Sequence, residues 1–549
     1  MPTHRFRRQA LRDLAILRAD AGEVANALTV LRDMAALPQP DDSLRLVLDR
    51  LLDQCRTTPN TSALPALLSA LPSIPMTTLD LSALELTSLD AVHGLPLTTL
   101  YCQDNCLTDL TSLRGMPLQL LSCRGNAVTD LTPLRGMPLH ILHCEDNDIT
   151  DLAPLTGMPL TSLFCWGNKI QDLTPLHGMP LRIFYCSQNA ITDLTPLRGM
   201  PLESLVVNAN RITDLTPLRG STTLRGVYCS DNHLISLEPL RECILNDLTC
   251  DRNPISDLTP IADMPLEFLD CTACMLTDLS LLQGSPIRRL YCSENAIADL
   301  TPLAELPLEE LVCDHTLVTD LMPLAMCPLR QLTIHGISLT VPNQELLAAI
   351  PLIELSCDLS PAAMTLPERI PSLTVLNKHT CAHVTQVGPV LYEVLAAWRA
   401  GHPSPSRQAL RAYAETFGDT AYLALPVLLP RNDALALSHY LGAQLICPST
   451  AEQQHAVEHY LAGVTVADAV LDPKVVTVLY HLGLGLDPTS KQLAWQSGAP
   501  YLWHTWKSQV NERLAASGGR LVCEYHCINK TVLWSCSQAP AYVLLEWDV

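Results

Sequence analysis

The sequence predicts an α/β solenoid in which short parallel strands stack into a β ladder, with a helical cap before them and a mainly helical domain after them. Two observations lead to this prediction. A unit of about 21 residues recurs through the middle of the 549-residue chain, which is typical of repeat architectures. One register of that unit is held by eleven of the 21 cysteines, namely Cys102, Cys123, Cys144, Cys165, Cys186, Cys229, Cys250, Cys271, Cys292, Cys313 and Cys357.

The segments follow one another in a simple order. Residues 1–75 include "SLRLVLDRLLDQC" and a longer run of the same kind, whose apolar residues recur at helical spacing, so we expect a helical N-terminal cap. Residues 76–360 carry the repeats and form the predicted solenoid. Residues 361–379 are expected to be a linker, and residues 380–549 a mainly helical C-terminal domain with a terminal β element.

The repeat unit reads L-x-x-L-x-C-x-x-N-x-I-T-D-L-T-P-L-R-G-M-P, and fourteen turns are visible, with Leu81, Val207 and Ile334 also at the cysteine register. Alternation with period two turns leucine and cysteine inward and the residues beside them outward. The asparagine three positions after the cysteine is expected to satisfy backbone groups where the chain leaves the strand. The aspartate is expected to cap a short helical turn over "LTPL", after which Gly-Met-Pro turns the chain back.

This unit resembles the leucine-rich repeat, and specifically the short bacterial internalin-like class with its "DLTPL" segment. The resemblance covers about residues 76–360. It implies a curved solenoid that binds partners, usually proteins, on the concave face formed by its strands. The unit departs from that class in two ways, because it has 21 residues rather than about 22, and because cysteine replaces the central leucine of the strand.

Cysteine is expected to act as a small apolar residue inside this shorter coil. Parallel side chains in register keep neighbouring thiols near the strand spacing of about 4.8 Å, so the ladder cysteines should be free. Reduced thiols fit a reducing compartment, and no apolar run is long enough to cross a membrane. The start, "MPTHRFRRQALRDLAILRAD", is basic but lacks the uninterrupted apolar core of a secretory signal. We therefore expect a cytoplasmic protein that binds no membrane, while a secretion-apparatus signal without an apolar core is compatible with the same sequence.

The net charge of −21 is concentrated in the repeats. Residues 76–360 hold 14 Lys and Arg against 34 Asp and Glu. This surface repels a phosphate backbone, so the charge excludes nucleic acid as a partner there. The alternative to a role in binding is that the acidity only maintains solubility.

Binding is expected on the outward strand positions, where aromatic rings gather although only 5% of the chain is aromatic. Rings from three consecutive turns should form one patch, as in a binding hot spot, and acidic neighbours favour a protein partner with a basic or apolar surface. The alternatives are ordinary packing between strands, or coverage of the face by a flanking domain. The predicted partner-binding residues are His143, Phe164, Trp166, Tyr185, Tyr101, Tyr228, Tyr291, Glu145, Asp251 and Asp270.

Two patterns in the C-terminal domain are compatible with metal chemistry. "HAVEH", His455 to His459, matches H-x-x-E-H, although an amphipathic surface helix also accounts for it. Four soft side chains lie within fourteen residues without the spacing of a regular zinc site: Cys523, His526, Cys527 and Cys536.

These patterns do not outweigh the repeat. We predict a non-catalytic protein-binding scaffold that has no cofactor and no bound metal. The alternative is an effector-like substrate-recognition arm of a C-terminal cysteine-dependent enzyme or zinc module. The partner's identity and the oligomeric state stay open at this point.

Overall fold

The computed structural model describes residues 11–16, 24–35, 42–57, 63–73, 76–402, 406–417, 420–429, 431–441, 443–445, 479–481, 484–486, 493–495, 522–526, 531–535 and 541–548. They fall into two compact units, Met1–Met275 and Leu276–Val549. Both units contain parallel strands that alternate with short helical turns. This alternation confirms the predicted leucine-rich repeat solenoid.

The first unit begins with the helices α2 Val24–Ala35, α3 Asp42–Thr57 and α4 Ala63–Ala70, followed by the 3₁₀ helix η1 Leu71–Ser73. Their apolar faces form a core that includes Met34, Leu51 and Leu67, each without exposed surface. At the end of α3, the Arg56 side chain donates from Nε to the Ser82 carbonyl oxygen at 2.8 Å. The helical segment is thus bonded to the first coil of the solenoid.

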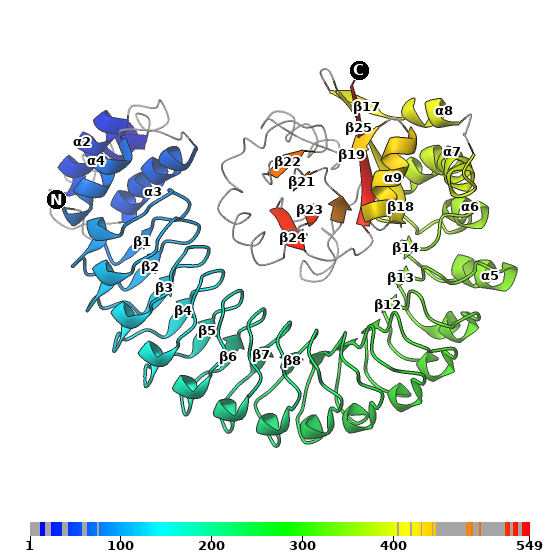
Figure 1. Cartoon of the computed structure of the whole chain (residues 1–549), viewed down its shortest axis with the longest axis horizontal. Helices are drawn as coiled ribbons and strands as arrows, with labels where there is room; N and C mark the ends of the chain where they lie inside the picture. Colours follow the sequence, from blue (N-terminus) through cyan, green and yellow to red (C-terminus); the bar gives the residue numbers. More distant parts are fainter. Residues whose placement is uncertain are drawn as a thin grey trace, which may run out of the picture. The chain divides into compact units, whose positions relative to one another are not determined.

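The strands of the first unit pair in parallel, each with the next. Within this unit the strands line the inner side of a curved array and the 3₁₀ helices line the outer side (Figure 1). The strands are β1 Thr78–Asp80, β2 Thr99–Tyr101, β3 Leu120–Ser122, β4 Ile141–His143, β5 Ser162–Phe164, β6 Ile183–Tyr185, β7 Ser204–Val206, β8 Gly226–Tyr228, β9 Asp247–Thr249 and β10 Phe268–Asp270. The 3₁₀ helices are η2 Asp90–Val92, η3 Thr111–Leu113, η4 Thr132–Leu134, η5 Ala153–Leu155, η6 Thr174–Leu176, η7 Thr195–Leu197, η8 Thr216–Leu218, η9 Glu238–Leu240 and η10 Thr259–Ile261.

The cysteine register points into the core, as the alternation predicts. Leu163 and Cys165 have no exposed surface, and the ladder cysteines are buried and form no disulfide. Burial, and then the nearby Glu145 carboxylate, raise the pKa of the Cys123 thiol to about 12. The ladder thiols are therefore packed as apolar groups and are not poised as nucleophiles.

The recurring asparagine closes the corner between strand and loop. Asn147 Oδ1 accepts from the Val128 N–H at 2.9 Å, and its Nδ2 donates to the carbonyl oxygens of Cys123, Cys144 and Glu145. Asn126 and Asn168 repeat this pattern on the adjacent turns. The predicted structural role of these amides is confirmed.

The convex turns follow the predicted chemistry as well. The Thr132 N–H at the start of η4 donates to Asp130 Oδ1 at 2.8 Å. Hydrogen bonding to the Thr132 hydroxyl, and then to this N–H, lowers the pKa of the Asp130 carboxyl. Gly136 has φ +73°, and the next residue, Met137, is 3% exposed. Glycine is needed there because a left-handed φ carries little strain without a Cβ atom.

The second unit continues with the same alternation. The elements up to residue 399 are η11 Ser280–Leu282, β11 Arg289–Tyr291, η12 Thr301–Leu303, β12 Glu310–Val312, η13 Met322–Met326, β13 Gln331–Thr333, α5 Val341–Ala349, β14 Glu354–Ser356, α6 Pro361–Arg369, β15 Val375–Leu376, β16 His379–Thr380 and α7 Cys381–Arg399. Strands β11 to β15 pair in parallel, and β16 pairs with β15 in the antiparallel direction. The segment expected to be a linker, 361–379, thus contains a helix and a strand of the ladder.

The C-terminal part combines helices with a β-sheet. This sheet includes the predicted terminal strands and also strands from earlier in the domain. Its sheet order is β17-β18-β25-β20-β23-β24, with β19 beside β25, and β21 and β22 form a separate pair. Apolar residues of α7, β18 and α9, including Leu391, Leu423 and Leu437, form one core cluster. The elements are α8 Arg407–Arg411, β17 Glu415–Phe417, β18 Thr420–Leu429, α9 Arg431–Leu441, β19 Gln444–Leu445, β20 Leu479–His481, β21 Leu484–Leu486, β22 Leu493–Trp495, β23 Val522–His526, β24 Thr531–Ser535 and β25 Ala541–Asp548.

Candidate functional site

Three of the predicted site residues stand side by side on the strand face of the first unit. His143, Phe164 and Tyr185 end the strands β4, β5 and β6, and each is the direct register partner of the next. The sequence places them there because each precedes an inward cysteine. All three are partly exposed, whereas the cysteines beside them are fully buried.

The three rings touch in an ordered way. The His143 and Phe164 rings stack with centroids 4.2 Å apart and an interplanar angle of 3°. The Phe164 and Tyr185 rings meet edge to face, with centroids 5.0 Å apart and an angle of 83°. Such contacts fix the rings in place, so a partner that covers them loses little side-chain entropy in doing so. We call His143, Phe164, Tyr185 and the adjacent Trp166 the aromatic patch.

Trp166 follows the inward Cys165, and its ring makes a cation–π contact with Arg124. The Arg124 Cζ atom lies 5.4 Å from the centroid of the Trp166 ring. Arg124 Nε is also 3.6 Å from Asp146 Oδ2, and the Arg124 side chain is 46% exposed. The sequence prediction did not include Arg124, although its position directly after a ladder cysteine puts it in the same outward column as Trp166.

Glu145 occupies that column on the turn between Arg124 and Trp166. Its side chain is only 6% exposed, and its Oε1 atom lies 2.9 Å from His143 Nδ1. Glu145 Oε2 is buried and has no hydrogen-bond partner in the described part of the chain, and the same is true of Gln103 Oε1 and Ser187 Oγ in this column. The column therefore offers polar atoms whose bonding is incomplete.

The remaining predicted rings lie apart from the aromatic patch. Tyr101 is separated from His143 by β3, and Tyr228 is separated from Tyr185 by β7. Tyr228 lies against Gly226, where an added Cβ atom would come within 2.9 Å of the Tyr228 ring. Tyr291 belongs to the second unit, where its hydroxyl donates to Glu310 Oε1 at 2.6 Å.

Asp251 and Asp270 form a second acidic position, on the turns of β9 and β10. Asp251 is 5% exposed and pairs with Arg252 at 3.0 Å. Burial, and then the nearby Asp251 carboxylate, raise the pKa of Asp270 from 3.8 to about 6. These two carboxylates add negative charge to the strand face of the unit without contacting the aromatic patch.

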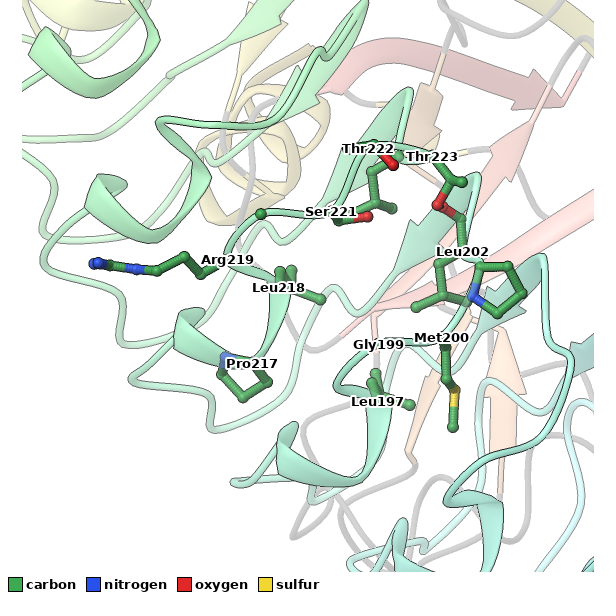
Figure 2. Close-up of a pocket in the computed structure, with 13 residues that line it drawn as sticks. Leu197, Gly199, Met200, Leu202, Pro217, Leu218, Arg219, Ser221, Thr222 and Thr223 are labelled. Atoms are coloured by element: carbon green, nitrogen blue, oxygen red, sulfur yellow. The ribbon is translucent and has the colours of Figure 1, made fainter.

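A small cavity of about 270 Å³ lies at the irregular 22-residue turn (Figure 2). Ser221 there takes the position of Met200, because the N–H groups of both donate to the carbonyl three residues earlier, at 3.1 and 3.2 Å. A serine in place of methionine leaves space between Leu202 and Leu224, which also line the cavity. Since it contains none of the predicted site residues, we read the cavity as a packing defect.

The described ranges contain neither a cluster of metal-ligating side chains nor a membrane-spanning helix. Within them, no group of three or more His, Cys, Asp and Glu side chains is arranged to hold a metal ion. No helix among the same residues combines the length and apolar character needed to span a membrane. His455 to His459, Cys527 and Cys536 lie outside the described residues, as do the side chains of Cys523 and His526.

Comparisons with known proteins give matches among solved structures only. No protein-family model matches the sequence, and a search of curated proteins finds no match. An internalin (InlF) from Listeria monocytogenes is 24% identical, covering 51% of this chain and 90% of its own, with a TM-score of 0.45.

Two further structures show a similar level of likeness. The functional domain of InlJ from Listeria monocytogenes, which includes a cysteine ladder, is 24% identical over 56% of this chain and 63% of its own, with a TM-score of 0.38. A leucine-rich repeat protein from Leptospira interrogans is 18% identical over 60% of this chain and 98% of its own, with a TM-score of 0.43. At these scores the fold is established by the strand register and repeat geometry of the chain itself.

Proposed function

We propose that this leucine-rich repeat solenoid is a non-catalytic scaffold that binds a protein partner on the strand face of its first unit, with the aromatic patch at the centre of the contact. The observation that carries the proposal is the partly exposed row of His143, Phe164 and Tyr185 on three paired strands. Large, rigid rings at such positions supply much of the free energy of protein association.

Packing between strands alone is a weaker explanation of this face. In the second unit the outward residues Glu310, Gln331 and Glu354 are each no more than 8% exposed. The rings of the patch keep part of their surface accessible instead, and they lie beside a column of polar atoms that have no partner among the described residues. A face with accessible rings and incomplete polar bonding is better suited to a partner than to closure within its own chain.

The proposed compartment is the cytoplasm. Its support is that the described cysteines, those outside the ladder included, form no disulfide, as expected in a reducing environment. The proposed partner has a basic or apolar surface, because residues 76–360 carry 34 acidic against 14 basic side chains.

Site-specific photo-crosslinking in the source cell tests the proposed face. A benzophenone amino acid replaces Tyr185 in one variant and the exposed Tyr392 of α7 in the control variant. We expect one dominant protein adduct from position 185 that is lacking at position 392. Trp166→Ala combined with Tyr185→Ala should then abolish binding of that purified partner without lowering the melting temperature. Equal binding by the double variant would refute the proposed site.

A further inference from the structure

Glu145 is a buried charged group on this face whose bonding within the described part of the chain is incomplete. One carboxylate oxygen, Oε1, bonds His143, while the other, Oε2, is buried and has no partner among the described residues. Leaving a buried charged oxygen without a donor is costly, and native proteins usually satisfy such atoms. The arrangement therefore favours a ligand that brings the missing donor.

The neighbours of Glu145 define what kind of donor fits. Trp166 is the next residue in the same column, and an indole face attracts cations through its quadrupole. Gln103 Oε1, two turns earlier in this column, is a second buried acceptor without a partner in the described ranges. A site made of acceptors and an aromatic face matches a guanidinium or ammonium group, which has donors and no acceptor.

Arg124 shows that this face can hold such a cation. Its guanidinium lies over Trp166, and its Nε atom is near Asp146 Oδ2 at 3.6 Å. No ion pair joins it to Glu145 at a distance of 4 Å or less, and nearly half of its side chain is exposed. A half-exposed surface arginine in that place can be displaced at small cost, because exposed ion pairs contribute little.

We propose that an arginine or lysine side chain of the protein partner docks beside Trp166 and donates to Glu145 Oε2, taking the place of the Arg124 guanidinium on the indole. The inference rests on the proposed function and deepens it by naming the chemistry of the partner. Glu145 selects a basic side chain of the partner at the centre of the contact, and the hydrogen bond with His143 holds the Glu145 carboxylate in position. The aromatic patch supplies the surrounding apolar contact.

A random 12-residue peptide library, displayed on phage and selected on the purified full-length chain, tests this directly. We expect enrichment of peptides with Arg or Lys at one fixed position. Glu145→Gln keeps the shape of the side chain and removes its charge. Asp148→Asn is the matched control, since it removes one charge three residues away, where Asp148 pairs with Lys169.

The affinity of the most enriched peptide then separates a local contact from general acidity. Glu145→Gln should weaken the Kd at least tenfold and Asp148→Asn less than twofold, at equal melting temperatures. Replacing the basic residue of the peptide with citrulline or norleucine should cost tenfold on the wild type and almost nothing on Glu145→Gln, because the two changes remove one contact. Arg124→Gln should tighten binding a few-fold.

Several outcomes would overturn the inference. They are enrichment of peptides without a basic residue, no enrichment at all, equal effects of Glu145→Gln and Asp148→Asn, or weaker binding by Arg124→Gln. The proposed function is judged separately with the same peptide. If Trp166→Ala with Tyr185→Ala abolishes its binding while Glu145→Gln does not, the face stands and the cation site fails. If the double variant binds normally, both fail.

Discussion

Replacing Asn147 with alanine removes one side chain that bonds two adjacent turns of the solenoid. Its Oδ1 is the acceptor for the Val128 N–H, and its Nδ2 donates to three carbonyl oxygens. The carbonyls of Cys123 and Cys144 keep a donor each from Asn126 and Asn168, and the Glu145 carbonyl keeps the Gly125 N–H. Only the Val128 N–H loses its bond outright.

The hydrogen bonds lost in Asn147→Ala determine the expected decrease in the free energy of unfolding. Burying the Val128 N–H without a partner costs about 1–3 kcal/mol, and the lost bonds of the two Nδ2 hydrogens add about 0.5–1 kcal/mol each. We therefore expect Asn147→Ala to lower the free energy of unfolding by about 3 kcal/mol. The chain contains weaker versions of the same position, because Cys274 and Thr316 each donate to one carbonyl there.

Hydrogen exchange measured by mass spectrometry is the suitable assay, because long repeat arrays often do not unfold in two states. Protection should fall in the segment 123–149 and much less in distant turns. Asn208→Ala is the control, since Asn208 Oδ1 accepts a single bond, from the Ser230 N–H at 2.9 Å, and should lose less than about 1 kcal/mol. Equal, small losses for both variants would refute the reasoning about the asparagine column.

Two further predictions concern other parts of the first unit. Because the folded-state pKa of Asp270 is raised to about 6, the folded state holds this proton to a higher pH than the unfolded state does, and the contribution of Asp270 to the free energy of unfolding should fall as the pH rises from about 4 to about 6. Asp270→Asn should thus be more stable than the wild type by about 2 kcal/mol at pH 7.5 and equal to it at pH 4, as measured by denaturant titration at both pH values. A lower stability of this variant at pH 7.5 would contradict the inference that burial of the Asp270 carboxylate is costly. Ser221→Met should fill the cavity beside Met200 and raise the free energy of unfolding by about 1 kcal/mol, as measured by thermal melts. Ser221→Ala is the control and should leave the stability unchanged. A lower melting temperature for the methionine variant would show that the cavity cannot hold the larger side chain.

The periodic features of this protein could be predicted from its sequence because one physical rule acts at every turn. Inward cysteines, bonded asparagines and capped 3₁₀ turns each follow from a position in the unit, as at Cys165, Asn147 and Asp130. The neighbouring positions of His143, Phe164 and Tyr185 follow in the same way from register.

The features that break or ignore the period could not be predicted. Contacts on the outward face depend on rotamers, so the placement of Arg124 over Trp166 and the burial of Glu145 have no sequence signal beyond their shared column. The cavity lies where one methionine position holds Ser221. Strand β15 pairs with β14 although its segment lacks the 21-residue unit, which is why it was expected to be a linker.

The most direct measurement is the rate at which each cysteine of the native full-length chain reacts with iodoacetamide, resolved by mass spectrometry. The aromatic patch and Glu145 face a partner only if the sulfur column lies inside the solenoid. Cys106, which is exposed, should therefore be alkylated rapidly, while Cys144, Cys165 and Cys186 should react only as fast as the solenoid unfolds. Alkylation of these three at the rate of Cys106 would show that the sulfur column is not buried.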